Sequence, residues 1–149
     1  MIRTEAEYKA SLHQLAQHEG RLKQQTQQMK RAKLSREEIK RVLDPVRCHY
    51  EQIRDEVTSY ERLKRGEFDE LQNFSGVGRL LIALRIAKGI SQRELAARTE
   101  ASETQVSRDE RNEYHGITVD RATRILEALE VQITTEVKSL QGMRGKAEC

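Results

Sequence analysis

The chain has 149 residues, of which 36% are hydrophobic and 34% charged, and it contains one proline and no tryptophan. This composition fits long, solvent-exposed helices in one or two small domains better than a single compact globule. The formal net charge of +3 is mild, so it permits nucleic-acid binding but does not demonstrate it.

Several functional classes are excluded by what the sequence lacks. No apolar run approaches transmembrane length, and the first residues lack the apolar core of a secretion signal, so we expect a cytoplasmic protein that does not enter a membrane. Cys48, Cys149 and the four histidines show no metal-ligand spacing. No nucleophile–base arrangement or phosphate-binding loop is recognisable. We therefore expect no enzyme activity, no cofactor and no metal.

The first predicted helix runs from Thr4 to about Arg31. Thr4 followed by Glu7 is a capping box, in which a hydroxyl and a carboxylate satisfy the free amides at the start of a helix. Apolar residues then alternate at spacings of four and three, the period of a coiled-coil face, with Glu19 and Thr26 at the remaining steps. The apolar members of this seam are Tyr8, Leu12, Leu15, Leu22 and Met29.

A second predicted helix starts after Ser35, which forms another capping box with Glu38. Pro45 lies inside its seam. Either the helix is kinked there, or a short helix ends near Leu43 and a longer one begins at Asp44; we favour a kinked rod, because the seam keeps its phase across the proline. The seam residues are Ile39, Leu43, Val46, Tyr50, Ile53, Val57 and Tyr60.

Two seamed helices with a short connection predict an antiparallel, coiled-coil-like hairpin over residues 1–65. Each seam needs apolar partners, either from the other helix or from another copy of the chain. Residues 21–41, around the expected tip, hold eight basic and two acidic side chains, a formal charge of +6. The simpler interpretation is a solvated helix end, and the alternative is a patch that contacts nucleic acid or an acidic partner.

Residues 66–77 are predicted to link this hairpin to a second domain, because they contain two glycines and polar turn residues. The only phenylalanines of the chain, Phe68 and Phe74, lie in this segment. We expect both side chains to dock the linker onto the domain that follows.

Residues 78–137 predict a domain of four or five short helices. The first helix is apolar and ends at Gly89, a residue that tolerates the left-handed conformation of a helix end. The last predicted helix is capped by Thr118 and runs to Leu129. Together with the hairpin, this domain makes the predicted fold class all-α.

Between these helices lie two short capped helices joined by a tight turn. Ser91 and Ser102 are the N-caps, and Glu94 and Gln105 follow each of them three residues later, as in capping boxes. Val106 anchors the second helix, whose other positions are polar. Short polar side chains on such a helix suit readout of the DNA major groove, although a plain corner between two helices has the same pattern.

The segment LRIAKGISQRELAARTEASETQVSRDE resembles the Xre/Cro-type helix-turn-helix of lambdoid phage repressors and many bacterial regulators. The resemblance covers about residues 78–131. It implies a recognition helix at about Ser102–Arg111 in the major groove, braced by Gln92, and an ion pair between Arg85 and Glu110. The candidate DNA-binding residues are Gln92, Ser102, Glu103, Thr104, Gln105, Ser107, Arg108 and Arg111.

The sequence departs from that family in the turn and on the recognition helix. Glu100 stands where the family usually has glycine. Asp109 occupies a position that is commonly apolar, and we expect Tyr114 to cover the gap. Glu103 brings a carboxylate close to the expected DNA surface, where it could accept a hydrogen bond from a cytosine amino group or lower non-specific affinity.

After Leu129, the alternation in VQITTEV favours a short strand. A lone strand needs a partner, which a second chain could supply; the alternative is a tail that lies on the domain. We expect residues 138–149 to form a flexible tail.

The leading hypothesis is a sequence-specific regulator of transcription that binds double-stranded DNA as a homodimer, because one small domain rarely reaches useful specificity. The order of TEAEYKASL, SYERLKRGEF and a repressor-like half is also similar to antitoxins of the host-inhibition-of-growth type. That similarity implies an alternative, in which the N-terminal helices bind a toxin and the protein regulates its own operon. A purely structural coiled-coil adaptor would leave the polar recognition helix without a purpose.

Overall fold

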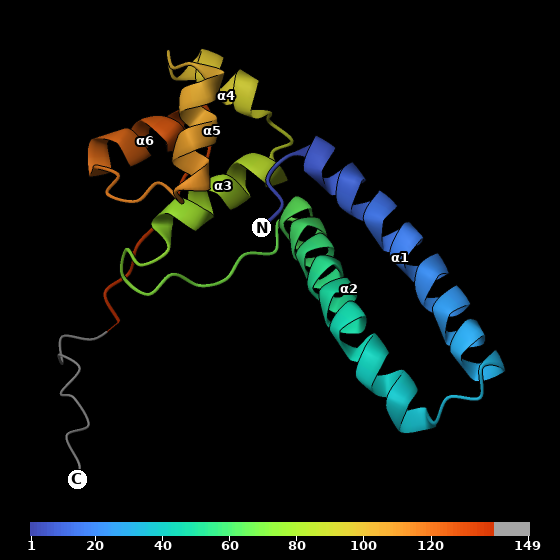
Figure 1. Cartoon of the computed structure of the whole chain (residues 1–149). Coiled ribbons are helices and arrows are strands. Elements are labelled where there is room, and N and C mark those ends of the chain that lie inside the picture. Colours follow the sequence, from blue (N-terminus) through green and yellow to red (C-terminus); the bar gives the residue numbers. More distant parts are fainter. Residues whose placement is uncertain (139–149) are drawn as a thin grey trace, which may run out of the picture.

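The computed structural model describes residues 1–138 and shows a long helical hairpin joined to a cluster of four short helices (Figure 1). The predicted all-α fold class is therefore confirmed. Nearly all of the expected flexible tail, residues 139–149, lies outside the described residues. The helices are α1 (Glu5–Arg31), α2 (Arg36–Lys64), α3 (Val77–Ala87), α4 (Gln92–Arg98), α5 (Glu103–Arg111) and α6 (Val119–Ala128).

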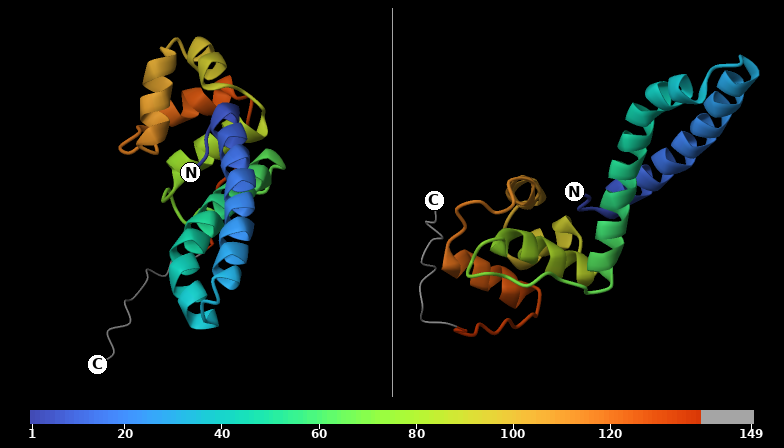
Figure 2. Two further views of the ribbon diagram at one scale, coloured as in Figure 1. Left: turned by 45° about the vertical axis from the view of Figure 1, so that its right-hand side comes forward. Right: turned by 90° about the horizontal axis from the view of Figure 1, so that it is seen from below.

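The hairpin consists of α1 and α2, which run antiparallel side by side (Figures 1 and 2). Both predicted capping boxes are present, with the hydroxyls of Thr4 and Ser35 each accepting a hydrogen bond at 3.2 Å from the amide three residues later. α2 runs unbroken through Pro45, which confirms a single rod. The right-hand view of Figure 2 shows α2 bending in its first third, the part that contains this proline.

The contact between the two helices buries few side chains completely. Leu43 of α2 is fully buried, but α1 contains no fully buried residue. The predicted α1 seam was wrong at Leu12, which is 40% exposed, whereas Ser11 and His18 are half-buried. His18 meets His49 of α2 edge to face, with ring centroids 5.4 Å apart. The spacing in the sequence locates the apolar stripe along the helix. It does not show which side of that stripe packs against the second helix.

The main hydrophobic core lies between α3, α4, α5 and α6. Leu81, Leu95 and Leu129 are each at most 1% exposed. Gly78 permits the close approach of α3 to the loop that follows α5, because a Cβ atom at this position would lie 1.9 Å from the backbone oxygen of Glu113. This close approach packs the start of α3 against Glu113 and Tyr114, which follow α5.

The base of the hairpin belongs to the same core. Ile2, and Val57 and Tyr60 near the end of α2, are 4–6% exposed and pack with residues of α3–α6. Tyr60 also stacks on Tyr8, with ring centroids 5.0 Å apart, and its hydroxyl donates to the carboxylate of Glu5 at 3.2 Å. The hairpin and the helical cluster therefore meet in one continuous core, although a linker separates them in sequence.

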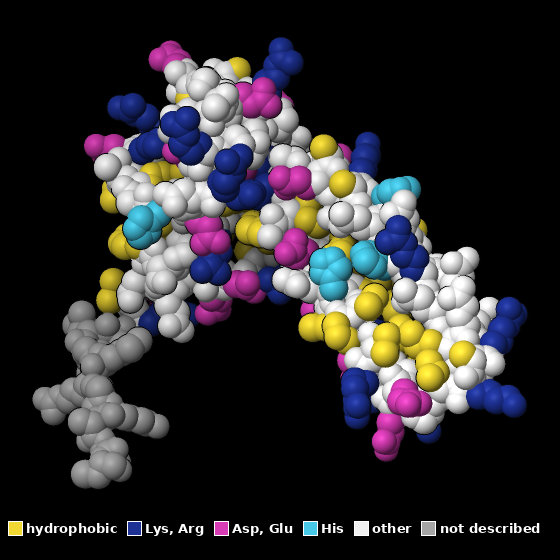
Figure 3. All heavy atoms as spheres, in the orientation of Figure 1, with side chains coloured by type: hydrophobic (Ala, Val, Ile, Leu, Met, Phe, Trp, Pro, Cys, Tyr) yellow, Lys and Arg dark blue, Asp and Glu magenta, His cyan; other side chains and the backbone are white. Residues whose placement is uncertain are grey.

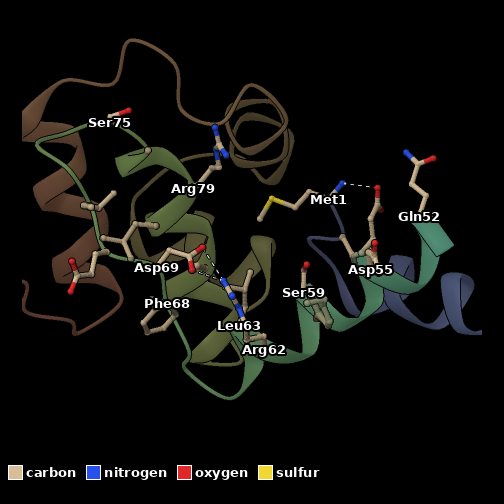
Figure 4. Close-up of a pocket in the computed structure, with 18 residues that line it drawn as sticks. Met1, Gln52, Asp55, Ser59, Arg62, Leu63, Phe68, Asp69, Ser75 and Arg79 are labelled. Carbon is tan, nitrogen blue, oxygen red and sulfur yellow. Dashed lines mark hydrogen bonds and ion pairs between the residues drawn. The ribbon is translucent and has the colours of Figure 1, made fainter. Parts of the chain in front are cut away.

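The linker bounds an open hollow of about 670 Å³ between α2 and α3. Figure 4 shows Arg62 reaching from α2 to Asp69 of the linker, with its Nη2 atom 2.8 and 2.9 Å from the two carboxylate oxygens. The expectation that both phenylalanines dock the linker was wrong for Phe74, which is 70% exposed. Phe68 is 38% exposed and lines the hollow. Two ion pairs, Arg62–Asp69 and Arg65–Glu67, rather than two aromatic side chains, tie this segment to the hairpin.

Residues 131–138 form no strand, so the predicted strand was wrong for the single chain. Val131 packs half-buried against the core, whereas Ile133 and Val137 are 39% and 79% exposed. An extended segment becomes a strand only when its backbone groups pair with a neighbour, and no segment among residues 1–138 pairs with this one.

Candidate nucleic-acid interface

The turn between α4 and α5 sets the geometry of the candidate interface. The hydroxyls of Ser91 and Ser102 cap the two helices, each accepting a hydrogen bond at 3.1 Å from the amide three residues on. Glu100 has a φ of 54°, and the amide of Ala101 donates to the carbonyl of Ala96 at 2.9 Å. These features define a Schellman helix end, in which the left-handed position is usually glycine. The turn therefore forms with a glutamate held in a strained conformation.

A buried ion pair fixes the far end of α5. Arg85 of α3 is 3% exposed and Glu110 of α5 is fully buried. Two hydrogen bonds join them, from Nε to Oε1 at 2.5 Å and from Nη2 to Oε2 at 2.7 Å. Arg85 also donates from Nη1 to the carbonyl of Ile90 at 2.8 Å. A two-point contact between planar groups restricts both the distance and the rotation of α5 relative to α3.

Gln92, the first residue of α4, joins this network. Its Nε2 atom donates to Oε2 of Glu110 at 2.8 Å, so its side chain braces α5 against the start of α4. An open groove of about 390 Å³ lies between this point and the outer face of α5. Six of the eight candidate DNA-binding residues line the groove: Gln92, Glu103, Thr104, Ser107, Arg108 and Arg111.

Two candidates lie outside the groove. The hydroxyl of Ser102 is occupied as the N-cap of α5. Gln105 is half-buried, and its Nε2 atom donates to Asp109 at 2.8 Å, one helical turn further on. The outward positions of α5 therefore belong to Thr104 and Arg108 rather than to Gln105.

Asp109 is accommodated at its commonly apolar position by two polar partners. Besides Gln105, its carboxylate contacts the guanidinium of Arg121 on α6 in an ion pair, and it is 15% exposed. Tyr114 is buried beside this pair, and burial raises the pKa of its phenol well above the usual range. The spacing of four between Gln105 and Asp109 was visible in the sequence. Arg121 was missed because it lies on another helix.

Charges of both signs surround the groove. Arg108 and Arg111 can contact phosphates or base edges, whereas Glu103 can only accept hydrogen bonds. Figure 3 shows lysine and arginine side chains spread over this face of the helical cluster, with acidic side chains among them. On such a mixed surface, attraction of a charged ligand depends on the placement of individual side chains more than on a strong overall electrostatic field.

Two further properties bear on function. Within residues 1–138, no three His, Cys, Asp or Glu side chains gather as a metal site. None of the described helices is long and apolar enough to span a bilayer.

Residues 81–135 match a family model described as helix-turn-helix. The match begins within α3 and ends beyond α6, so it contains every candidate DNA-binding residue and both members of the buried ion pair. Searches of curated proteins and of solved structures give no significant match.

Proposed function

We propose that this DNA-binding regulator, whose residues 81–135 form an Xre/lambda-repressor-like helix-turn-helix domain, binds a specific operator as a homodimer and controls transcription in the cytoplasm. The observation that carries the proposal is the groove beside α5, which six polar side chains line while Val106 and Glu110 are buried on the opposite side of the helix. An α-helix of this kind fits the DNA major groove.

Roles within the groove follow from the chemistry of each side chain. Arg108 presents a planar donor suited to the O6 and N7 acceptors of guanine, and Thr104 can donate, accept or contact a thymine methyl group. Gln92 and Arg111, at the edges of the groove, are suited to phosphate oxygens. Gln105 would contribute indirectly, by holding Asp109.

The hairpin supports the proposal of a homodimer. Leu12, Leu34 and Val42 are 40%, 40% and 54% exposed, and Figure 3 shows apolar side chains along one face of the hairpin. Residues 21–41 at the tip carry a charge of +6, whereas residues 5–20 and 50–64 at the base hold seven acidic and four basic side chains, a charge of −3. A second hairpin packed antiparallel would cover the apolar face and set each basic tip against an acidic base.

Selection of bound duplexes from a random pool tests this function. The expected result is an enriched inverted repeat, because a two-fold dimer presents the same recognition helix twice. A pool that shows no enrichment above non-specific binding would reject sequence-specific recognition. An enriched single half-site would retain DNA reading and reject the homodimer.

An antitoxin remains the second candidate function, and the same exposed face of the hairpin favours it, because a toxin could cover that face instead of a second copy. Light scattering on the purified chain separates the two. A dimer mass at micromolar concentration supports the homodimer. A monomer mass leaves the face uncovered and favours a protein partner.

A further inference from the structure

The residues that precede α1 lie against the helix-turn-helix domain. Ile2 is 4% exposed and belongs to the core formed by α3–α6 and the base of α2. Figure 1 shows this end of the chain beside α3 and the base of the hairpin. The hairpin therefore reaches the domain by a second route, independent of the linker between α2 and α3.

Arg3 contacts both members of the buried ion pair. Its backbone oxygen accepts a hydrogen bond from Nη2 of Arg85 at 2.9 Å, and its own Nη1 atom donates to the backbone oxygen of Glu110 at 3.1 Å. Glu110 lies in the last turn of α5, where a positive charge is favourable, and its carbonyl also accepts from the amide of Glu113 at 3.0 Å. Arg3 is thus a side-chain donor to the C-terminal end of the recognition helix.

The same short segment is held rigidly to α1. The carboxylate of Glu7 accepts from the amides of Arg3 at 2.8 Å and Thr4 at 3.3 Å, and the hydroxyl of Thr4 accepts from the amide of Glu7 at 3.2 Å. The bonds therefore run without a gap from the first turn of α1 through Arg3 to the end of α5. A tilt of the hairpin relative to the recognition helix must break or bend some of them.

We propose that Arg3 is a positioning residue for DNA recognition, which fixes the angle of α5 to the hairpin without contacting DNA itself. The proposal rests on the proposed function and adds a route by which whatever covers the hairpin influences DNA binding. In a dimer, the hairpins would set the separation of the two recognition helices through this contact as well as through the linker.

The test compares Arg3→Ala with Arg47→Ala in the full chain. Arg47 is an exposed residue of α2, so both variants lose one positive charge. Affinity for the selected operator is measured by fluorescence anisotropy over a range of salt concentrations. We expect Arg3→Ala to weaken binding about tenfold, because one charge-assisted hydrogen bond is lost, and Arg47→Ala to leave affinity nearly unchanged. The dependence of log affinity on log salt stays the same in all three proteins, because no phosphate contact is removed.

Arg3→Lys separates position from charge. The lysine keeps the charge but lacks the planar fork of the guanidinium, so we expect it to restore little of the lost affinity. Full rescue by lysine, a salt slope lowered by about one in Arg3→Ala, or affinity equal to that of Arg47→Ala would each overturn the proposal.

Hydrogen exchange provides a readout that does not require DNA. The amides of Asn112 and Glu113 donate to backbone oxygens in the last turn of α5, and Arg3→Ala should speed their exchange several-fold while those of α4 stay unchanged. If no operator is found but this exchange still rises, the proposed function fails while the positioning contact stands. Unchanged exchange at both amides would reject the contact itself.

Discussion

Arg85 and Glu110 form the buried ion pair that joins α3 to the end of α5. Their charges are almost wholly removed from water and satisfy each other through two hydrogen bonds. Glu110→Ala leaves a buried guanidinium without its counter-charge, so we expect a loss of about 3–5 kcal/mol in the free energy of unfolding. Urea denaturation measures it.

The matched control is Glu113→Ala, which breaks the neighbouring Arg79–Glu113 ion pair. Both of its side chains are more than half exposed, so we expect a loss of about 1 kcal/mol or less. Equal losses in the two variants would mean that burial does not distinguish these pairs.

Glu100 is the residue at which the turn carries a conformational cost. A left-handed φ is costly for a residue with a Cβ atom and free of that cost for glycine. We expect Glu100→Gly to raise the free energy of unfolding by about 1 kcal/mol, and Glu100→Gln, which removes only the charge, to change it little. Thermal unfolding of both variants checks this, and a gain in the glutamine variant equal to that of glycine would assign the effect to charge.

Tyr60 makes stability depend on pH at alkaline values. Burial, followed by the nearby Glu5 carboxylate and the hydrogen bond to it, raises the pKa of Tyr60 from about 10 to about 12. Between these values the folded chain retains a proton that the unfolded chain releases. The stabilisation from this group is therefore complete below about pH 10 and is lost as the pH rises towards 12.

Tyr60→Phe should remove the part of the tyrosinate absorbance change that appears near pH 12 in the folded protein. It should also flatten the fall in stability over that range. If the variant had the same absorbance titration as the wild type, Tyr60 would not be the group that ionises near pH 12.

At the scale of single elements, α3 depends on one glycine. A side chain at Gly78 must displace the backbone of the loop after α5, so Gly78→Ala should destabilise the fold by about 1–3 kcal/mol. A Cβ atom added at Gly20, inside α1, would meet nothing within 4 Å, so Gly20→Ala should stabilise the helix by about 0.5–1 kcal/mol. Urea denaturation compares the two, and changes of the same sign would contradict the packing of α3 against that loop.

Helix starts were predictable because their causes are local. Thr4 with Glu7 and Ser35 with Glu38 lie three residues apart, and the structure contains both boxes. Glu94 had the same spacing from Ser91, but its carboxylate binds Arg98 instead, so only the hydroxyl half of that cap forms. When a side chain has two possible partners, its surroundings in the fold determine which one it binds. The spacing of residues in the sequence does not reveal those surroundings.

At the scale of the whole molecule, the spacing of residues in the sequence did not predict the contacts that join distant segments. The family resemblance implied the contact of Arg85 with Glu110, but nothing pointed to Arg3, which lies 107 positions from Glu110. The extended segment at residues 131–138 and the exposed face of the hairpin have a common cause. Each exposes groups that find no partner within residues 1–138, and sequence spacing alone did not show that they stay exposed.

Affinity of Arg108→Ala for the selected operator and for a random duplex tests most directly the claim that the groove beside α5 reads DNA. If Arg108 contacts a base edge, the variant should lose about 1–3 kcal/mol of binding free energy on the operator beyond its loss on random DNA, while Arg47→Ala changes both alike and little. An equal loss of affinity on operator and random DNA for Arg108→Ala would contradict base readout at this groove.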